Sequence, residues 1–372
     1  MKFLFWFSAG LIVYTYAGFI VWLWLRARLS PWPVRRGPHL PSVSIVMVVR
    51  NEERALREKL QNLFALDYPS NLYDVVVVSD GSMDKTEAIL REWGDPRLHI
   101  VMNQLSRGKA SGLNDGVQVS QGELVMFTDA RQKIEPSALR VLVENFADTE
   151  VGCVSGELML GEMESGEAKE GMGLYWQVEK KVRELEAASG CVVGATGALY
   201  VVRRELLVSV PEGTILDDVY IPMHVVKQGK RVLFEPRARG WDSPNLGAER
   251  EFARKVRTLS GNYQLLQLAP WLLGGQNPIR FEFVSHKLLR LVAPFALVVA
   301  FVTSALISSS GYRVLWLLQV AFYGMSLLAL FRFELGLLSR AAGAAMTFVV
   351  LNAAAVVAFA NFAGGRKTGW GR

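Results

Sequence analysis

Cysteine and histidine are scarce in this chain. Its 372 residues include two cysteines, Cys153 and Cys191, and four histidines. Two cysteines are too few for a disulfide framework, and none of the histidines stands at the spacing of zinc ligands. A disulfide-stabilised scaffold and a zinc site are therefore disfavoured.

The sequence also lacks the glycine-rich loops of two large classes of nucleotide-binding enzyme. Lys109 follows Gly108, but there is neither a Gly-x-x-x-x-Gly-Lys-Ser/Thr loop nor a Gly-x-Gly-x-x-Gly fingerprint. This absence argues against a nucleotide hydrolase and a dehydrogenase. The net charge of +6 does not indicate a nucleic-acid partner either, because the arginines are not interleaved with aromatic residues.

Charge is missing from four long stretches at the two ends of the chain, although 20% of all residues are charged. The uncharged stretches are residues 3–25, 291–312, 314–331 and 341–365. Each is close to the roughly 20 residues that a helix needs to cross a hydrocarbon core about 30 Å thick. We predict one membrane helix at the N-terminus and three near the C-terminus.

Basic residues indicate how these helices are oriented. They flank the central part of the chain on both sides, as Arg26, Arg28, Arg35 and Arg36 before it and Lys287 and Arg290 after it. The positive-inside rule places both flanks in the cytoplasm. We therefore expect a multi-pass protein of the plasma (inner) membrane with a cytoplasmic central domain. Strict alternation would leave the basic C-terminal tail outside, which the same rule disfavours, so the C-terminal topology stays open.

The expected organisation has five parts. A transmembrane helix covers residues 1–25, a cytoplasmic domain 26–268, an interfacial segment 269–290, membrane helices 291–365 and a basic tail 366–372. The segment 263–273 fits two structures equally well. It is either a helix of the domain core or an in-plane helix that holds the active site against the bilayer.

The central domain alternates between strand-like and helix-like periodicity. Strand-like runs lie at residues 43–49, 74–78, 98–102 and 123–128, and helix-like runs lie between them, as at 85–93 and 112–119. This alternation predicts an α/β fold with a doubly wound, mainly parallel sheet. Ligands bind such sheets beyond the carboxyl ends of the strands.

Acidic residues stand at or near those ends. Asp80 and Asp129 each follow an apolar run, and the pair Asp217-Asp218 follows Ile215-Leu216. A single aspartate there is often only a turn former or a helix cap. Several in one α/β domain suit a divalent cation that bridges phosphates, together with a base for an attacking hydroxyl.

The motifs in this domain resemble those of a known family. They are Arg50-Asn51-Glu52, Asp80-Gly81, Gly108-Lys109 with Asn114, Asp129, Gly197 and Asp217-Asp218. In this order, across about residues 40–260, they resemble the family 2 inverting glycosyltransferases of GT-A fold, and are similar to their polysaccharide synthase branch. The resemblance implies a GT-A type doubly wound mixed sheet flanked by transmembrane helices.

The resemblance also implies residue roles. Glu52 and Asp80 would contact the nucleoside of the donor. Asp129 would hold a Mg²⁺ or Mn²⁺ ion bound to its diphosphate. Asp218 would be the catalytic base, with Asp217 orienting the site. The other substrate-binding positions it implies are Arg50, Asn51, Gly81, Lys109, Asn114, Arg131, Gly197, Arg254 and Arg257.

Two positions depart from the family pattern. Arg257 matches the arginine of the synthases' Gln-(Gln/Arg)-x-Arg-Trp motif, but Thr258 stands in place of its tryptophan, which argues against processive synthesis. Arg131 stands where the second acid of Asp-x-Asp would be. It either meets phosphate oxygens as a fixed cation or pairs with Glu135 at the surface.

The function expected from the sequence is transfer of a sugar, with inversion, from a nucleotide-diphosphate donor, with a UDP-sugar favoured. The acceptor would be a polysaccharide or a lipid-linked glycan at the cytoplasmic membrane face. The alternative is a non-catalytic sugar-nucleotide-binding membrane protein of polysaccharide export. Retention of Asp80, Asp129 and Asp218 disfavours this alternative, because such a protein would have no need of all three acids.

Overall fold

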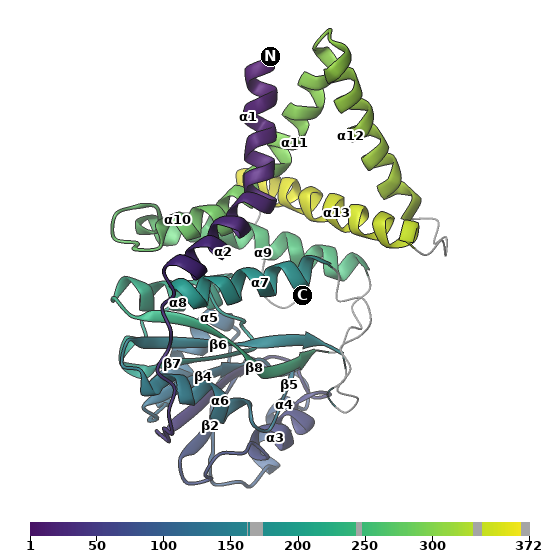
Figure 1. Cartoon of the computed structure of the whole chain (residues 1–372). Coiled ribbons are helices and arrows are strands. Elements are labelled where there is room, and N and C mark those ends of the chain that lie inside the picture. Colours follow the sequence, from purple (N-terminus) through teal and green to yellow (C-terminus); the bar gives the residue numbers. More distant parts are fainter. Residues whose placement is uncertain (162, 164–173, 243–247, 330–336, 366–372) are drawn as a thin grey trace.

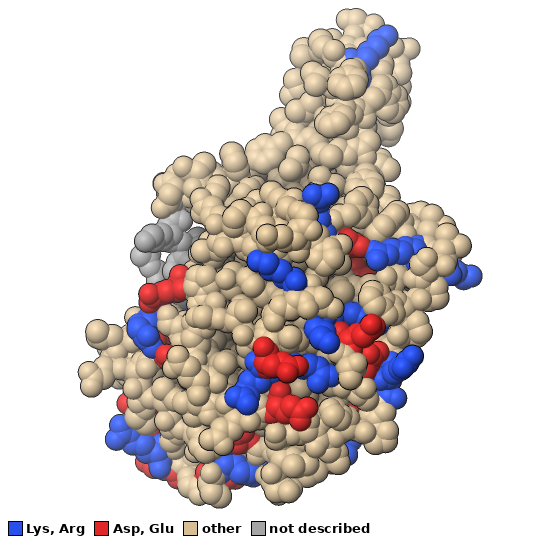
Figure 2. All heavy atoms as spheres, turned by 90° about the vertical axis from the view of Figure 1, so that its left-hand side faces the viewer, with Lys and Arg blue, Asp and Glu red and all other residues tan. Residues whose placement is uncertain are grey.

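The protein has an α/β domain with a group of long helices projecting from one side of it (Figure 1). The computed structural model describes residues 1–161, 163, 174–242, 248–329 and 337–365. The projecting helices show almost no charged side chains on the face in Figure 2, whereas the α/β domain carries both signs. This distribution agrees with the uncharged stretches of the sequence.

The described residues form an eight-stranded sheet of order β3-β2-β1-β4-β7-β6-β8-β5. Four strands form its parallel half: β1 (Val43–Val49), β2 (Tyr73–Asp80), β3 (Leu98–Asn103) and β4 (Leu124–Thr128). All four lie where the sequence predicts them. The predicted β-branched runs suit these strands because both of their faces are covered.

The second half makes the sheet mixed. It contains β7 (Leu199–Arg203), β6 (Val151–Leu160), β8 (Arg231–Asp242) and β5 (Lys133–Ile134). Strand β7 runs antiparallel to both of its neighbours, β4 and β6, while β8 is parallel to β6 and antiparallel to β5. The expected GT-A type mixed sheet is confirmed.

Helices cover both faces of the sheet. Ile45 and Met47 of β1 face α3 (Leu56–Phe64), and the same core includes side chains of α4 (Thr86–Glu92) and α6 (Ala138–Val143). Val46 and Val48 point the other way, toward α5 (Lys109–Val119) and the core that includes α8 (Asp217–Lys227). Helix α5 lies so close to this face that a Cβ on Gly112 would be 2.7 Å from the side chain of Val48.

Two helices lie between the sheet and the projecting helices, namely α7 (Leu174–Ser189) and α9 (Ala248–Leu268) (Figure 1). Leu265 of α9 is buried in the domain core. Tyr263 stacks on Phe362 of α13 (Leu337–Ala363), with ring centroids 5.1 Å apart. This part of the segment 263–273 is thus a helix with protein on both sides. After it come η4 (Pro270–Leu273) and α10 (Arg280–Phe283).

Three helices are long and apolar enough to cross a membrane, by length and composition, among the described residues. They are Lys2–Leu29, Arg280–Leu306 and Ala341–Ala363. The first comprises α1 (Lys2–Val13), η1 (Tyr14–Gly18) and α2 (Phe19–Leu29), and the second comprises α10, η5 (Val284–Leu288) and α11 (Leu289–Leu306). The second begins before residue 291 because the π-helical turn η5 joins α10 to α11 without a break.

The expectation of three C-terminal spans is wrong for the described part of the chain, which has two. Residues 310–328 do form a helix, α12 (Ser310–Leu328), but Arg313 and Gln319 keep it below the apolarity of a span. Residues 330–331 of the predicted stretch 314–331 and the tail 366–372 lie outside the described residues. Gln319 donates to Ser304 of α11 at 3.0 Å, so this amide links neighbouring helices.

The first span is tied to the α/β domain through one buried arginine. Arg231, at the start of β8, donates to the carbonyls of Trp32 at 2.8 Å and Ala187 at 3.2 Å. Its guanidinium also lies 4.3 Å from the ring centroid of Trp32. Arg231 is 2% exposed, so water cannot reach these carbonyls to donate hydrogen bonds in its place. One side chain therefore joins the linker after α2, the end of α7 and the sheet.

We expect Arg231→Met to lower the free energy of unfolding by about 2–4 kcal/mol, because several buried carbonyls lose a charged donor. Urea unfolding in detergent micelles, followed by tryptophan fluorescence, measures this. Arg140→Met is the matched control, since Arg140 makes an ion pair with the exposed Asp67 and its loss should cost less than about 1 kcal/mol. Equal effects of the two substitutions would contradict the structural role of Arg231.

Candidate active site

The centre of the candidate site is one lysine shared by two carboxylates. Lys109 begins α5, and its Nζ lies 2.8 Å from Oδ1 of Asp129 and 3.6 Å from Oδ2 of Asp217. Asp129 follows β4, and Asp217 begins α8. Burial alone would lower the pKa of Lys109, but Asp129 and Asp217 raise it, so the ammonium is retained. The start of α5, the end of β4 and the start of α8 therefore meet at this ammonium group.

Asp218 lies beside this pair, in the first turn of α8. A Cβ on Gly197 would lie 3.2 Å from Oδ2 of Asp218, so only glycine leaves the carboxylate free of a tighter contact. Burial, and then the neighbouring Asp217, raise the pKa of Asp218 to about 6, against the opposing effect of nearby cations. A carboxylate with this pKa is ionised near neutral pH and still basic enough to accept a proton.

The sequence placed Asp217-Asp218 after a strand, and this detail is wrong. Leu216 precedes α8 directly and belongs to no strand, so the pair stands at a helix N-terminus. Backbone N–H groups at that end stabilise a negative charge. Burial raises the pKa of Asp217, and Lys109 opposes that effect.

Asp80 is fully buried at the end of β2 and organises a loop. Its carboxylate accepts from the Ser106 hydroxyl at 2.7 Å, the Arg107 N–H at 2.8 Å and the Gly108 N–H at 2.9 Å. Gly81 has φ +64°, and a Cβ there would lie 2.6 Å from the backbone nitrogen of Ser106. Asp80 thus fixes the loop that leads into Lys109, while its contact with a nucleoside stays a prediction.

Arg131 pairs with Glu52. Its Nε lies 2.9 and 3.1 Å from the two carboxylate oxygens of Glu52, and its NH2 group lies 2.8 Å from Oε1. The alternative partner Glu135 instead accepts from the indole of Trp241 at 2.9 Å. Arg131, which stands in place of the second acid of Asp-x-Asp, therefore neutralises Glu52, which is expected to contact the donor.

The neighbouring Arg50-Asn51 segment is held by the loop after β2. Asn51 has φ +54°, its side-chain oxygen accepts from the Met83 N–H at 2.8 Å, and its own N–H donates to Ser82 at 3.2 Å. The Nε atom of Arg50 is buried without a partner among the described residues. A ligand acceptor group would satisfy it.

For three other residues that are predicted to bind substrate, the structure gives contacts within the protein or an unpartnered atom. Asn114 bonds both the N–H and the carbonyl of Val210, at 2.9 and 2.8 Å. Arg254 lies 3.7 Å from Asp242 and 2.8 Å from Glu251. Arg257 has a buried Nε that is unpartnered in the described part of the chain. The substrate contacts expected of these residues stay predictions.

Lys59 is a residue that the motifs did not indicate. Its Nζ donates to the hydroxyl of Thr128, the residue before Asp129, at 2.9 Å and to the carbonyl of Gln132 at 2.6 Å. Burial lowers its pKa to about 7, and Asp129 opposes that effect. The signal was present in the sequence, because Lys59 falls on the apolar face of α3 at helical spacing from Leu56 and Leu63.

A cavity of about 410 Å³ opens beside Lys59 and residues 130–133. Lys59, Arg131, Lys133 and Trp241 are among the residues that line it, together with Glu58, which lies 2.7 Å from Lys133. Cationic and aromatic side chains around one cavity suit a phosphate-bearing ligand with a planar or apolar part.

The residues fit a divalent cation only in part. Among the described residues no three His, Cys, Asp or Glu side chains gather as a metal site. Asp129 is the one predicted ligand, and it is paired with Lys109. Mg²⁺ is often held by one or two carboxylates together with substrate phosphates, so Asp129 suffices only when a donor supplies the other oxygens.

Comparison with known proteins shows which family this domain resembles. Residues 44–208 match the family model described as Glycosyl transferase family 2. The chain carries a family 2 glycosyltransferase domain. The matched region includes β1 to β4 and Lys109, and it ends before Asp217. The resemblance drawn from the motifs is confirmed.

Curated relatives fall into more than one product class. The chain is 23% identical over 266 residues to the poly-beta-1,6-N-acetyl-D-glucosamine synthase of Staphylococcus aureus (strain COL), across 70% of this chain and 61% of that protein. It is 29% identical over 206 residues to the beta-monoglucosyldiacylglycerol synthase of Trichormus variabilis, across 53% of this chain and 44% of that protein. The chain thus spans less than two thirds of these relatives.

Solved structures share the fold. The mannosyltransferase PcManGT of Pyrobaculum calidifontis, solved with GDP-Man and Mn²⁺, has a TM-score of 0.76 at 23% identity, covering 98% of this chain and 99% of its own. Staphylococcus aureus TarS 1-349, solved with UDP-GlcNAc, has a TM-score of 0.50 at 15% identity and covers 89% of this chain and 93% of its own. The near-complete coverage by PcManGT extends the shared fold to the helices outside the α/β domain.

We expect Asp80→Ala to raise amide hydrogen exchange at Arg107 and Gly108 by about tenfold or more, because both amides lose a charged acceptor. Exchange measured by mass spectrometry on peptides that cover 103–110 tests this. Asp95→Ala, which removes the acceptor of the Arg97 N–H, should leave that region unchanged. Unaltered protection at 107 and 108 would show that Asp80 does not hold the loop.

Proposed function

We propose that the chain is a membrane-bound inverting glycosyltransferase that takes a sugar from a nucleotide-diphosphate donor. The observation that carries this proposal is the Asp217-Asp218 pair, with Asp217 buried, set beside the Lys109–Asp129 ion pair in a family 2 domain. A base with a pKa near neutrality and a cation for phosphate lie within one small site. Deprotonation of an acceptor and stabilisation of a leaving diphosphate need this combination.

The donor proposed is a nucleoside-diphosphate sugar, with a UDP-sugar favoured. Lys109 and Arg131 are cations near Asp129, and the cavity beside them is lined by further basic side chains. The structural relatives PcManGT and TarS were solved with GDP-Man and UDP-GlcNAc, which supports the donor class without deciding the base.

In the proposed reaction Asp218 accepts the proton of an acceptor hydroxyl as its oxygen attacks the anomeric carbon. The bond from that carbon to the diphosphate oxygen breaks on the opposite side, so the configuration inverts. Lys109 and Arg131 then meet the negative charge that develops on the diphosphate. A divalent cation on Asp129 would add to this charge stabilisation when bound. The diphosphate leaves as a stabilised anion, so no acid is required to protonate it.

The acceptor proposed is a polysaccharide or a lipid-linked molecule at the cytoplasmic face of the membrane. Helices α7 and α9 lie between the sheet and the apolar helices (Figure 1), and this proximity supports an acceptor that reaches the domain from the membrane. The named products of the relatives, a polysaccharide and a glycolipid, support both acceptor types. A non-catalytic export protein is the weaker alternative, because it would not need Asp218 held buried with a raised pKa.

We expect Asp218→Asn to lower turnover by about 10²–10⁴ while donor binding is nearly unchanged, because only the proton acceptor is lost. Release of nucleoside diphosphate from a panel of nucleotide sugars measures turnover, and calorimetry measures donor binding. Full activity of Asp218→Asn would reject its role as the base.

The pH profile gives a second, independent measurement. In the native protein the rate should rise as pH increases through about 6, where Asp218 loses its proton. Since Asp217 raises the pKa of Asp218, Asp217→Asn should move this acid limb to lower pH and be milder than Asp218→Asn at neutral pH. An acid limb that moves upward in Asp217→Asn would reverse the assigned roles.

We expect activity to be lost in EDTA and restored by Mg²⁺ or Mn²⁺, with Arg131→Asp lowering the metal concentration needed for half-maximal rate. The added carboxylate gives the ion a second charged ligand, and ligand charge sets the affinity of hard cations. Arg131→Gln is the control that removes the Glu52 pair without adding a ligand. Full activity in EDTA would exclude a required metal, and a raised requirement in Arg131→Asp would contradict the ligand argument.

A further inference from the structure

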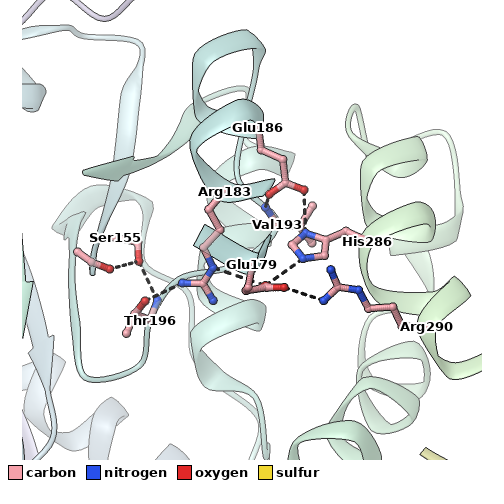
Figure 3. A network of polar contacts seen from close by, with 9 residues as sticks. Ser155, Glu179, Arg183, Glu186, Val193, Thr196, His286 and Arg290 are labelled. Atoms are coloured by element: carbon pink, nitrogen blue, oxygen red, sulfur yellow. Dashed lines mark hydrogen bonds and ion pairs between the residues drawn. The ribbon is translucent and has the colours of Figure 1, made fainter. Parts of the chain in front are cut away.

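A buried polar network joins the second apolar span to the α/β domain (Figure 3). His286 lies in η5, and its side chain is fully buried. Its Nδ1 lies 2.8 Å from a carboxylate oxygen of Glu186 and its Nε2 lies 3.0 Å from one of Glu179, both on α7. Arg290 of α11 donates to the second oxygen of Glu179 at 2.6 Å.

Both ring nitrogens of His286 therefore lie within hydrogen-bond distance of a carboxylate oxygen, so the imidazole links η5 to α7 at two points. Although burial would raise it, the pKa of Glu179 is held well below its usual range by Arg290 and His286. Buried charges of this kind keep a fixed geometry because every partner is needed to offset desolvation.

The network continues from α7 to the loop beside the candidate base. Arg183 lies 3.7 Å from Glu179 and donates to the Thr196 hydroxyl at 2.7 Å, while the Thr196 N–H donates to Ser155 of β6 at 2.8 Å. The Val193 N–H donates to Glu186 at 3.4 Å. Two separate connections therefore reach the loop 193–197 from the carboxylates that His286 holds (Figure 3).

That loop is in contact with Asp218. The Ala195 N–H donates to the backbone carbonyl of Asp218 at 2.7 Å, and Gly197 stands against its carboxylate. The charges that act on Asp218 are Asp217 and Lys109 from the site itself, with Lys287 from η5 and Arg183 from α7. The position of Arg183 therefore bears directly on the base.

We propose that His286, Glu179 and Arg183 are positioning residues that set the loop 193–197 against Asp218 and so couple the seating of the second span to the base. This deepens the proposed function and rests on it. None of the three contacts the reacting atoms. Their role is to fix Thr196, in the loop that contacts Asp218, and the side chain of Arg183, whose charge acts on the Asp218 carboxylate.

The first test does not depend on activity. Hydrogen exchange of the full chain in detergent micelles should increase about tenfold or more across 193–197 in His286→Gln and Arg183→Met, because their links to the loop are lost. Thr196→Val removes only the hydroxyl that Arg183 binds and serves if His286→Gln does not fold. Tyr14→Phe is the control, since it breaks a 2.9 Å hydrogen bond to Ser285, next to His286, keeps the aromatic ring and removes no hydrogen bond to α7.

The second test uses the acid limb of the rate profile. Arg183 lowers the pKa of Asp218, so Arg183→Met, His286→Gln and Thr196→Val should each move the limb to higher pH, and Arg183→Lys should restore part of the shift. Tyr14→Phe should leave it in place. A merely structural network would lower the thermal midpoint without moving this limb.

The outcomes separate the two proposals. Increased exchange with a shifted limb supports the positioning role. Unchanged exchange at 193–197 in all three variants, or an unshifted limb with normal protein folding, overturns it. A native chain that releases no nucleoside diphosphate from any nucleotide sugar overturns the proposed function instead, while the exchange result still reports on the network.

Discussion

The candidate site depends on one buried ammonium ion. Lys109 pairs with Asp129 and lies within ion-pair distance of Asp217, so it draws together the start of α5, the end of β4 and the start of α8. Without it, Asp129, Asp217 and Asp218 would repel one another, and burial would favour the protonated form of Asp217. The same charge would meet a donor phosphate, so the group that holds these three acids together is also suited to bind a ligand.

Charge compensation of this kind recurs where the domain meets the apolar helices. Arg231 satisfies backbone carbonyls from the linker and α7, and the imidazole of His286 lies between two carboxylates of α7. Such groups tolerate little displacement, because an unpartnered buried polar group is costly. The helices outside the α/β domain are therefore joined to it by buried polar contacts. The coverage of nearly the whole chain by one solved mannosyltransferase structure agrees with this.

The departures from the family pattern acquire partners in the structure. Arg131 neutralises Glu52, so the loss of the second acid of Asp-x-Asp is accompanied by a change in the charge of its surroundings. Thr258 bonds back to the carbonyl of Arg254 within α9, a contact that a tryptophan would not make. A relative named as a polysaccharide synthase and one named as a glycolipid synthase both match this domain.

The sequence by itself determined the parallel half of the sheet, the three apolar spans and the positions of the acids. Continuous β-branched runs, uncharged stretches and short polar turns are local signals that need no knowledge of packing. It placed a third C-terminal span wrongly, because α12 includes Arg313 just before the uncharged stretch and Gln319 within it. Only the tertiary structure decided that Lys109 lies between Asp129 and Asp217, that Arg131 meets Glu52 and that His286 meets α7. Arg131 and Glu52 are 79 positions apart in the sequence, and His286 is 100 and 107 positions from its two glutamates. Contacts between such distant residues leave no periodic pattern in the sequence.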